Sequence, residues 1–204
     1  MANESSNSLS DLSPQQKLRR FVHILIHKHG PLRNWRYFPT RFLLRKLRSD
    51  SADIRAYAAE GLGGVGDVHA ITPLINALSD EDTTVRRFAI SSLGHLRDAR
   101  AVEGLIPFLQ DEEPDMRCAA VVALGELGLT KERNQTPPTQ VIEALISSIT
   151  DTNRSVCSAA VVALGRIGNP QAVAALNTLA ETTESEWVQR YISEALHQIE
   201  EQNL

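Results

Sequence analysis

The residues of this chain that could perform chemistry are few and widely separated. His23 and His27 lie four positions apart, with His29 close by, and this spacing places imidazoles on one helical face, as some zinc sites require. Residues 17–48 contain no cysteine or carboxylate to complete a tetrahedral shell, although a ligand could come from elsewhere in the fold. Histidines beside an amphipathic stripe are more often structural, so we predict no metal site.

Two further patterns have a chemical and a structural interpretation. Residues 61–66 (GLGGVG) satisfy the G-x-G-x-x-G pattern of dinucleotide sites, but they close a helical pattern instead of following a strand, so we predict helix capping and close packing. Cys118 and Cys157 are too few for a disulfide framework and fit a reducing compartment. Adjacent helices lie about 8–10 Å apart, which argues against a bond between them. We favour the interpretation that both cysteines are small buried residues. A reactive thiol that lines a groove is the alternative.

Residues 33–42 interleave basic and aromatic side chains. Four of the chain's ten aromatic residues fall within residues 35–42. Arginine beside an aromatic ring suits a planar ligand that carries carboxylates, or an acidic protein surface. The alternative is that Phe38 and Phe42 belong to the core and the arginines are only solvated. The candidate binding residues of this segment are Arg33, Trp35, Arg36, Tyr37 and Arg41.

A repeated sequence must position these residues. Leu-Gly pairs at 62–63, 93–94, 124–125 and 164–165, and then Leu196, are separated by 31, 31, 40 and 32 residues, and residues 119–125 (AAVVALG) recur unchanged as residues 159–165. A period of this length is typical of a solenoid of stacked helical pairs. We expect first helices near 38–48, 68–79, 99–110, 138–150 and 170–182, and second helices near 53–65, 84–97, 115–128, 155–168 and 187–200.

The pattern predicts an all-α, right-handed solenoid of about five helical hairpins. Residues 1–13 are interpreted as a disordered polar tail and residues 14–204 as a single domain. A capping helix over 14–30 would precede repeats at about 31–66, 67–97, 98–128, 138–168 and 169–200, with an insertion loop at 129–137. Gly66, Gly128 and Gly168 should end second helices in the left-handed conformation, and the turn at Arg97 should close differently.

Acidic and basic residues also repeat with the period of the units. Asp80 precedes Arg86 by six positions, and Asp111 precedes Arg117 in the same way, but Cys157 stands six positions after Asp151. We expect such acids and cations to form a ladder of hydrogen bonds between units. The ladder should break at Cys157 and leave that junction looser.

Charge is distributed unevenly along the chain. The net charge is −4, yet residues 17–48 hold ten Lys or Arg and no acid, whereas residues 49–204 hold 11 basic and 23 acidic residues. The basic segment suits an anionic partner, and the acidic body argues against nucleic acid. Residues 1–13 lack the apolar core of a secretory signal, and no apolar run approaches a membrane span. We therefore expect a soluble, cytoplasmic protein.

The turn pattern Asp-x5-Arg, together with Val-Arg-x2-Ala-x3-Leu-Gly, resembles HEAT repeats over about residues 38–200. More narrowly, these short alanine-rich units are similar to those of the phycobilisome lyase family. That resemblance implies attachment of open-chain tetrapyrrole bilins to cysteines of phycobiliproteins, by subunits that act as lyases, isomerases or chaperone-like partners. The chain length resembles the smaller subunits, the chaperone-like one of phycoerythrin maturation included.

In stacks of this kind the second helices usually line the concave face, and residues opposite the buried stripe include Arg87, Ser91, Glu126 and Arg166 as candidate binding residues. Val122 and Val162 would be exposed between them, which suits a protein partner. If bilin chemistry occurs here, His95 is the candidate general acid, and Arg87 and Arg166 are candidate partners for the propionates.

The sequence contains no Ser/His/Asp constellation, no H-E-x-x-H and no paired-carboxylate motif. The leading hypothesis is a binding or chaperone-like subunit that grips a phycobiliprotein subunit together with a partner lyase subunit. It would hold no tight cofactor, although phycobilin could bind transiently. The alternatives are a lyase or isomerase, active alone or as half of a heterodimer, and a general scaffold with a basic anion-binding head.

Overall fold

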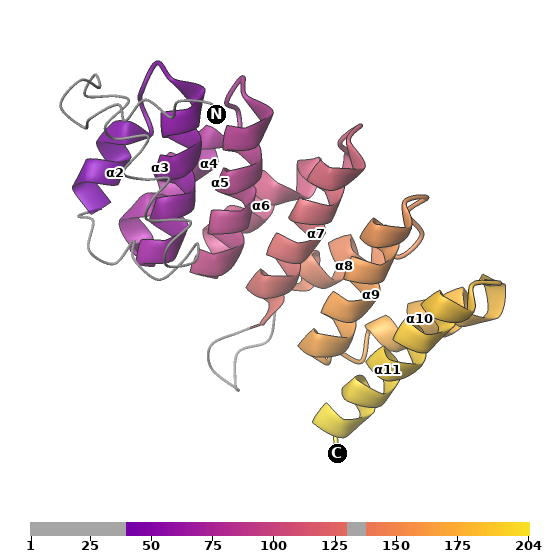
Figure 1. Cartoon of the computed structure of the whole chain (residues 1–204). Helices are drawn as coiled ribbons and strands as arrows, with labels where there is room; N and C mark the ends of the chain where they lie inside the picture. Colours follow the sequence, from indigo (N-terminus) through magenta and orange to yellow (C-terminus); the bar gives the residue numbers. More distant parts are fainter. Residues whose placement is uncertain (1–39, 130–137) are drawn as a thin grey trace, which may run out of the picture.

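The computed structural model describes residues 40–129 and 138–204. Every regular element in these two ranges is helical, as predicted, and neither range contains a strand (Figure 1). The predicted polar tail, the capping helix at 14–30 and most of the insertion at 129–137 lie outside the described residues.

The helices form pairs, which we call units 1 to 5. Unit 1 comprises α2 (Thr40–Lys46) and α3 (Ala52–Val65), and unit 2 comprises η2 (Val68–Ala70), α4 (Ile71–Ala77) and α5 (Thr83–Leu96). Unit 3 comprises η3 (Ala99–Ala101), α6 (Val102–Leu105), η4 (Ile106–Gln110) and α7 (Pro114–Gly128). Unit 4 comprises α8 (Thr139–Ser148) and α9 (Arg154–Ile167), and unit 5 comprises α10 (Ala172–Thr182) and α11 (Glu186–Gln202).

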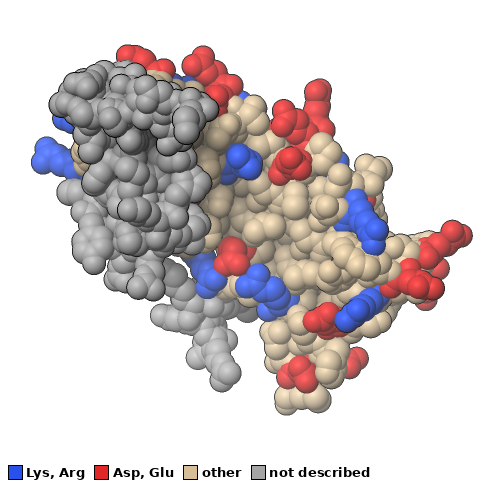
Figure 2. All heavy atoms as spheres, in the orientation of Figure 1, with Lys and Arg blue, Asp and Glu red and all other residues tan. Residues whose placement is uncertain are grey.

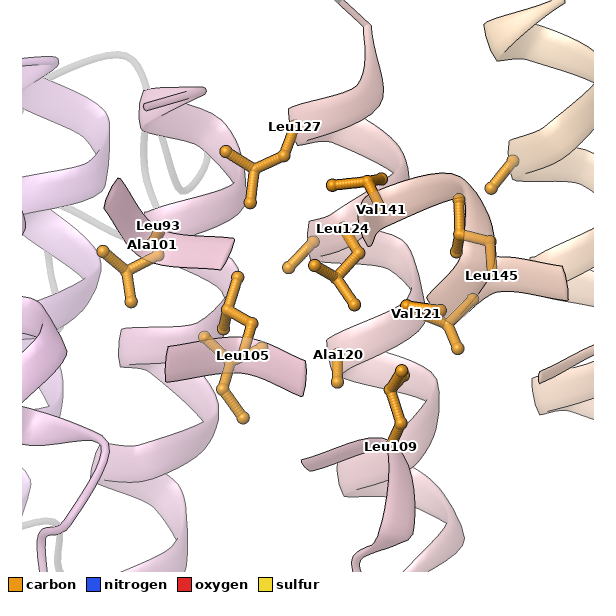
Figure 3. Close-up of a cluster of buried hydrophobic side chains, with 14 of the residues drawn as sticks. Leu93, Ala101, Leu105, Leu109, Ala120, Val121, Leu124, Leu127, Val141 and Leu145 are labelled. Carbon is orange, nitrogen blue, oxygen red and sulfur yellow. The ribbon is translucent and has the colours of Figure 1, made fainter. Parts of the chain in front are cut away.

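The units stack in chain order and form two layers. The second helices, α3, α5, α7, α9 and α11, pack side by side in one layer, and the first helices lie behind them (Figure 1). The repeated leucines of the sequence fill the space between the layers, and Leu62, Leu93, Leu124 and Leu164 are all fully buried. Figure 3 shows this core around Leu93 and Leu124, where side chains of the first helices, such as Leu105 and Leu145, meet them. One apolar stripe per helix therefore builds one continuous core.

The first helix of unit 3 departs from the prediction. Instead of one helix over 99–110, the chain forms a short α-helix between two 3-10 segments. Pro107 has no N–H to donate and its ring clashes with the carbonyl four residues earlier, which disfavours a continuous α-helix.

Arginine and aspartate side chains join units 1 and 2 and units 3 and 4. Arg55 donates two hydrogen bonds of 2.8 Å to the carboxylate of Asp80, and Arg117 binds Asp151 in the same bidentate way. Each arginine also donates to backbone carbonyls of its own turn. The predicted ladder therefore exists in part: at these two junctions the arginine of one unit binds the aspartate of the next. Arg86 instead donates to carbonyls of its own turn, Asp80 O and Glu81 O.

The junction at Cys157 is not looser in its helix packing. A Cβ atom added to Gly165 of α9 would lie 2.7 Å from the backbone of Ala195 on α11. A Cβ atom added to Gly63 of α3, at the junction that Arg55 and Asp80 join, would lie 2.8 Å from the backbone of Ser92 on α5. The expectation of looseness was wrong, because the approach of the second helices is set by small residues at their contact and not by the ladder.

The ends of the second helices partly follow the prediction. Gly66 and Gly168 adopt the left-handed conformation, with φ of 75° and 72°. Gly128 does not: it remains the last residue of α7, and its backbone packs against Ile167 of the next second helix. Arg97 adopts the left-handed conformation as well, with φ of 51°, so the expectation that its turn closes differently was wrong. Residues 61–66 form the last turn and cap of α3, as predicted.

Among residues 40–129 and 138–204, no helix combines the length and the apolar character needed to cross a membrane.

Candidate functional site

A groove of about 520 Å³ lies between the second helices α5 and α7. We call it the α5–α7 groove. Its lining residues come from both helices: Arg87, Phe88, Ser91, Gly94 and His95 from α5, and Asp115, Cys118, Ala119, Val122, Ala123 and Glu126 from α7.

The groove exists because α7 presents small side chains to α5. Ala119 and Ala123 belong to the duplicated AAVVALG segment and stand where α7 faces the preceding unit. Gly94 on α5 lets the two helices approach closely along their buried side. The short side chains above that contact leave a trough, and Arg87, packed 5.6 Å from the ring of Phe88, forms one of its ends.

The structure brings four of the predicted site residues together. Arg87, Ser91 and His95 follow one another at every fourth position of α5, all exposed, and Glu126 faces them from α7. Arg166 of α9 joins this group through Glu126, with 3.3 Å between its Nη1 and Oε1 of the carboxylate. Helical periodicity and the repeat period thus predicted that these five residues lie near one another.

The arginine–aromatic segment is not part of this group. Arg41 lies exposed on α2, in the layer of first helices, and does not line the α5–α7 groove. Arg33, Trp35, Arg36 and Tyr37 lie outside the described residues, as do His23, His27 and His29.

Glu126 lies at the end of the α5–α7 groove opposite Arg87, and two arginines contact its carboxylate. Burial raises the pKa of its carboxyl, but hydrogen bonds and charge from Arg97 and then Arg166 outweigh burial and hold the pKa below its ordinary value. The carboxylate is therefore ionised at neutral pH and bound by cations from units 2 and 4. Two guanidinium groups facing one carboxylate leave this end of the groove with an excess positive charge.

The two cysteines are free, in agreement with the prediction that no disulfide joins them. Cys118 lines the groove, where burial and then the nearby Asp115 and Asp151 raise the pKa of its thiol. Cys157 is buried, and its Sγ lies 3.0 Å from the carbonyl oxygen of Ile149. Because the thiolate is the reactive form, a raised pKa disfavours a nucleophilic role for Cys118.

His95 is exposed and makes no hydrogen bond within the described part of the chain. A general acid is normally oriented by a second group, and the groove supplies none for this imidazole. Within the same described ranges, no three His, Cys, Asp or Glu side chains gather in a way that could hold a metal ion. The groove does present a cation, Arg87, and an exposed apolar side chain, Val122.

Apolar side chains also lie open on the second-helix layer. Val122 is 52% exposed and Val162 is 38% exposed, as their place opposite the buried stripe predicted. On the face shown in Figure 2, acidic side chains gather near the upper edge and toward the C-terminal end, and the area between them is mostly uncharged. Such a surface fits a protein better than a phosphate backbone.

An exposed aromatic cluster was missed by the sequence analysis. Trp187 of α11 is 45% exposed, Arg154 of α9 lies 4.0 Å from the centre of its ring, and Tyr191 packs edge-on at 4.5 Å. Trp, Tyr and Arg are the residue types most often found at the energetic centre of protein interfaces. The repeat period could have revealed this cluster, because Arg154 and Trp187 lie at the starts of successive second helices, α9 and α11.

Comparison with known proteins agrees with this architecture. A model of HEAT repeats matches residues 40–125 and 102–197. Designed armadillo repeat proteins have a similar fold. One of them, in complex with the peptide (KR)4, shares 19% identity with a TM-score of 0.66, over 96% of this chain and 95% of that one. An engineered protein at 19% identity has a TM-score of 0.61, over 97% of this chain and 94% of its own.

A natural protein is also among the similar structures. In the complex of CpcE and CpcF of phycocyanin lyase from Nostoc sp. PCC7120, one chain is 25% identical with a TM-score of 0.61, over 77% of this chain and 97% of that one. A comparison with curated protein sequences finds no match. The HEAT model covers most of the chain and the helices pair and stack as its repeats do, so this protein belongs to the HEAT repeat family.

Proposed function

We propose that this HEAT repeat protein is a binding subunit that assists the covalent attachment of a phycobilin to cysteines of a phycobiliprotein, together with a partner lyase subunit. The observation that carries the proposal is the similarity to a chain of the CpcE–CpcF phycocyanin lyase complex, at 25% identity over nearly the whole of that chain. That neighbour is itself a complex of two chains, which supports a partner subunit for this one.

The α5–α7 groove supports a binding role. Arg87 lies at one end and Arg97 and Arg166 lie around Glu126 at the other, so carboxylates of a ligand or partner would find cations at both ends. The exposed Val122 lies between them and offers an apolar contact. A bilin carries two propionates on an apolar tetrapyrrole, and this arrangement suits such a ligand during transient binding.

The groove supports an accessory role better than independent catalysis. His95 has no orienting partner among residues 40–129 and 138–204, and the raised pKa of Cys118 keeps its thiol protonated at neutral pH. Neither group is prepared to move a proton or attack a bilin without help. We therefore assign the chemical step to the partner subunit and the positioning of the phycobiliprotein or bilin to this chain.

Reconstitution tests this proposal. Co-expression of the chain with a phycobiliprotein apo-subunit, bilin synthesis and a companion lyase subunit should raise the yield of covalent adduct, measured by absorption and by zinc-enhanced fluorescence of the denatured subunit. Omission of this chain should lower the yield. Adduct formed by this chain alone would show that it is a lyase in its own right. Failure to bind either a phycobiliprotein or a lyase subunit would overturn the proposal.

A charge reversal tests whether the α5–α7 groove carries the proposed function. Arg87→Glu should lower the adduct yield, because it places an acid where a propionate or an acidic partner side chain would bind. Arg100→Glu is the matched control, since Arg100 is an exposed arginine at the start of unit 3 and does not line the groove. Equal loss in both variants would assign the effect to net charge and not to the groove.

A further inference from the structure

A second groove, of about 580 Å³, lies between the first helices of units 1 and 2. We call it the α2–α4 groove. One wall is α2 and the turn after it, and the other is α4 and the turn that ends at Asp80. The lining residues are Leu44, Arg45, Leu47, Arg48, Thr72, Pro73, Asn76, Ala77 and Asp80.

One wall of this groove carries arginines that form no ion pair with any described residue. Arg41, Arg45 and Arg48 recur at helical spacing along α2 and its turn, and all three are exposed. None of them has an ion pair or a side-chain hydrogen bond within the described residues, whereas most arginines of the later units do. The carboxylate of Asp80 does not neutralise them, because it is held by Arg55 at 2.8 Å. An excess positive charge therefore faces the groove.

The rest of the lining is apolar or neutral. Leu44 and Leu47 are half-buried against the core, and Pro73 and Ala77 face them from α4. Leu44 and Leu47 lie three residues apart, so they present one apolar strip beside the arginines. An occupant that satisfies both parts must carry apolar side chains on one side and carboxylates next to them.

We propose that the α2–α4 groove docks an acidic amphipathic segment of a partner protein. The apolar strip favours a polypeptide over nucleic acid, whose binding rests on phosphate contacts. The chain's own residues 17–36 are an unsuitable occupant, because they hold six Lys or Arg and no acid, so the arginines would repel them. This site is lined by the first helices α2 and α4 and shares no lining residue with the α5–α7 groove, so it is independent of the proposed function.

A labelled peptide tests the proposal on the full chain. The probe is a synthetic helical peptide with leucines at helical spacing on one side and glutamates beside them, and its binding is followed by fluorescence anisotropy. We expect binding that weakens as salt rises. Arg45→Glu should weaken it by about tenfold, the effect of losing one charge-assisted contact. Arg190→Glu, which makes the same change of charge on an exposed arginine that lines neither groove, should leave it unchanged.

Control probes separate the other occupants. Replacing the leucines of the peptide with serine, or its glutamates with lysine, should abolish binding. Absence of binding by the Leu/Glu peptide, equal weakening by both variants, or equally tight binding of a single-stranded DNA would overturn the proposal. Self-association of the chain that Arg45→Glu abolishes would identify a second copy as the occupant, and would overturn it too. Because Arg45→Glu should not alter bilin attachment, failure here is distinguishable from failure of the proposed function.

Discussion

At the scale of single residues, Arg97 combines an unfavourable backbone with a favourable contact. Its φ of 51° lies in the left-handed region, where Gly66 and Gly168 occupy the matching positions of units 1 and 4. This conformation costs a residue with an L side chain about 1–2 kcal/mol. In return, the guanidinium reaches Glu126 of the next unit. Arg97 therefore combines a strained backbone with an ion pair that links units 2 and 3 beside the α5–α7 groove.

Substitution of Arg97 should separate these two effects. Arg97→Ala keeps the strained backbone and loses the contact with Glu126, so we expect a loss of about 1 kcal/mol in the free energy of unfolding. Arg97→Gly loses the same contact but relieves the strain, and should unfold close to the wild type. Urea denaturation measures both. A glycine variant less stable than the alanine variant would contradict this account.

At the scale of helices and turns, the bidentate pair of Arg55 and Asp80 joins unit 1 to unit 2. Both side chains are largely removed from water, at 11% and 13% exposure, and the carboxylate also accepts the backbone N–H of Asp82. Such a pair is not a surface ion pair, because loss of either partner leaves buried donors or acceptors without a replacement.

Asp80→Ala should therefore lower the free energy of unfolding by about 2–3 kcal/mol, since it removes charge-assisted hydrogen bonds to a shielded guanidinium. Glu81→Ala is the matched control: Glu81 contacts the same arginine at 3.3 Å but is 88% exposed. We expect the control to change stability by less than about 0.5 kcal/mol. Thermal or urea unfolding measures the stability of both variants. Similar losses of stability in Asp80→Ala and Glu81→Ala would contradict the distinction between a shielded and an exposed carboxylate.

The second helices approach one another closely enough that the contact positions tolerate no larger residue. At Gly165 a Cβ atom would meet the backbone of Ala195, which cannot move without displacing α11. At Gly104 the nearest atom is Cδ1 of Leu78, 3.1 Å away, at the end of a flexible side chain.

Gly165→Ala should destabilise the protein by about 1–3 kcal/mol through overpacking. Gly104→Ala should be near neutral, because the leucine can shift and alanine favours helix. The comparison uses the same substitution in both cases, so denaturation midpoints report the local space alone. A neutral Gly165→Ala would show that α9 and α11 can separate at little cost.

At the scale of the whole molecule, stability depends on contacts between neighbouring units, because no unit buries its apolar stripe alone. Aspartates contribute to these contacts. A hydrogen bond from Thr40 of α2, and then the backbone N–H of His69, lower the pKa of Asp67 from 3.8 to about 2. Hydrogen bonds from arginine likewise lower the pKa of Asp80 and Asp151.

The sign of the pH dependence follows from these shifts. A carboxyl whose pKa is lowered on folding stabilises the native state above its unfolded pKa and loses that contribution as pH falls through the folded value. Stability should therefore be constant near neutral pH and decline from about pH 4 toward pH 2. Urea denaturation over this range checks it. Asp67→Asn should show a shallower decline, and an unchanged slope in that variant would remove Asp67 from the explanation.

Much of this architecture follows from the sequence. The second helix expected at 84–97 is Thr83–Leu96 in the structure, and the others agree as closely, because a leucine stripe at helical spacing and a turn of polar residues are local signals. Part of the α5–α7 groove was also predictable: Arg87, Ser91 and His95 share a helical face, and the repeat period aligns Glu126 with them.

What the sequence could not determine depends on distances between units. That Arg55 binds Asp80, that Arg97 reaches Glu126 and that Arg154 stacks on Trp187 all follow from how far one helix lies from the next. The sequence by itself determined the period, the helices and the buried stripe, since these arise from neighbours along the chain. Only the tertiary structure decided which side chains of different units meet and where small residues leave the two grooves open, because those outcomes depend on packing between surfaces far apart in sequence.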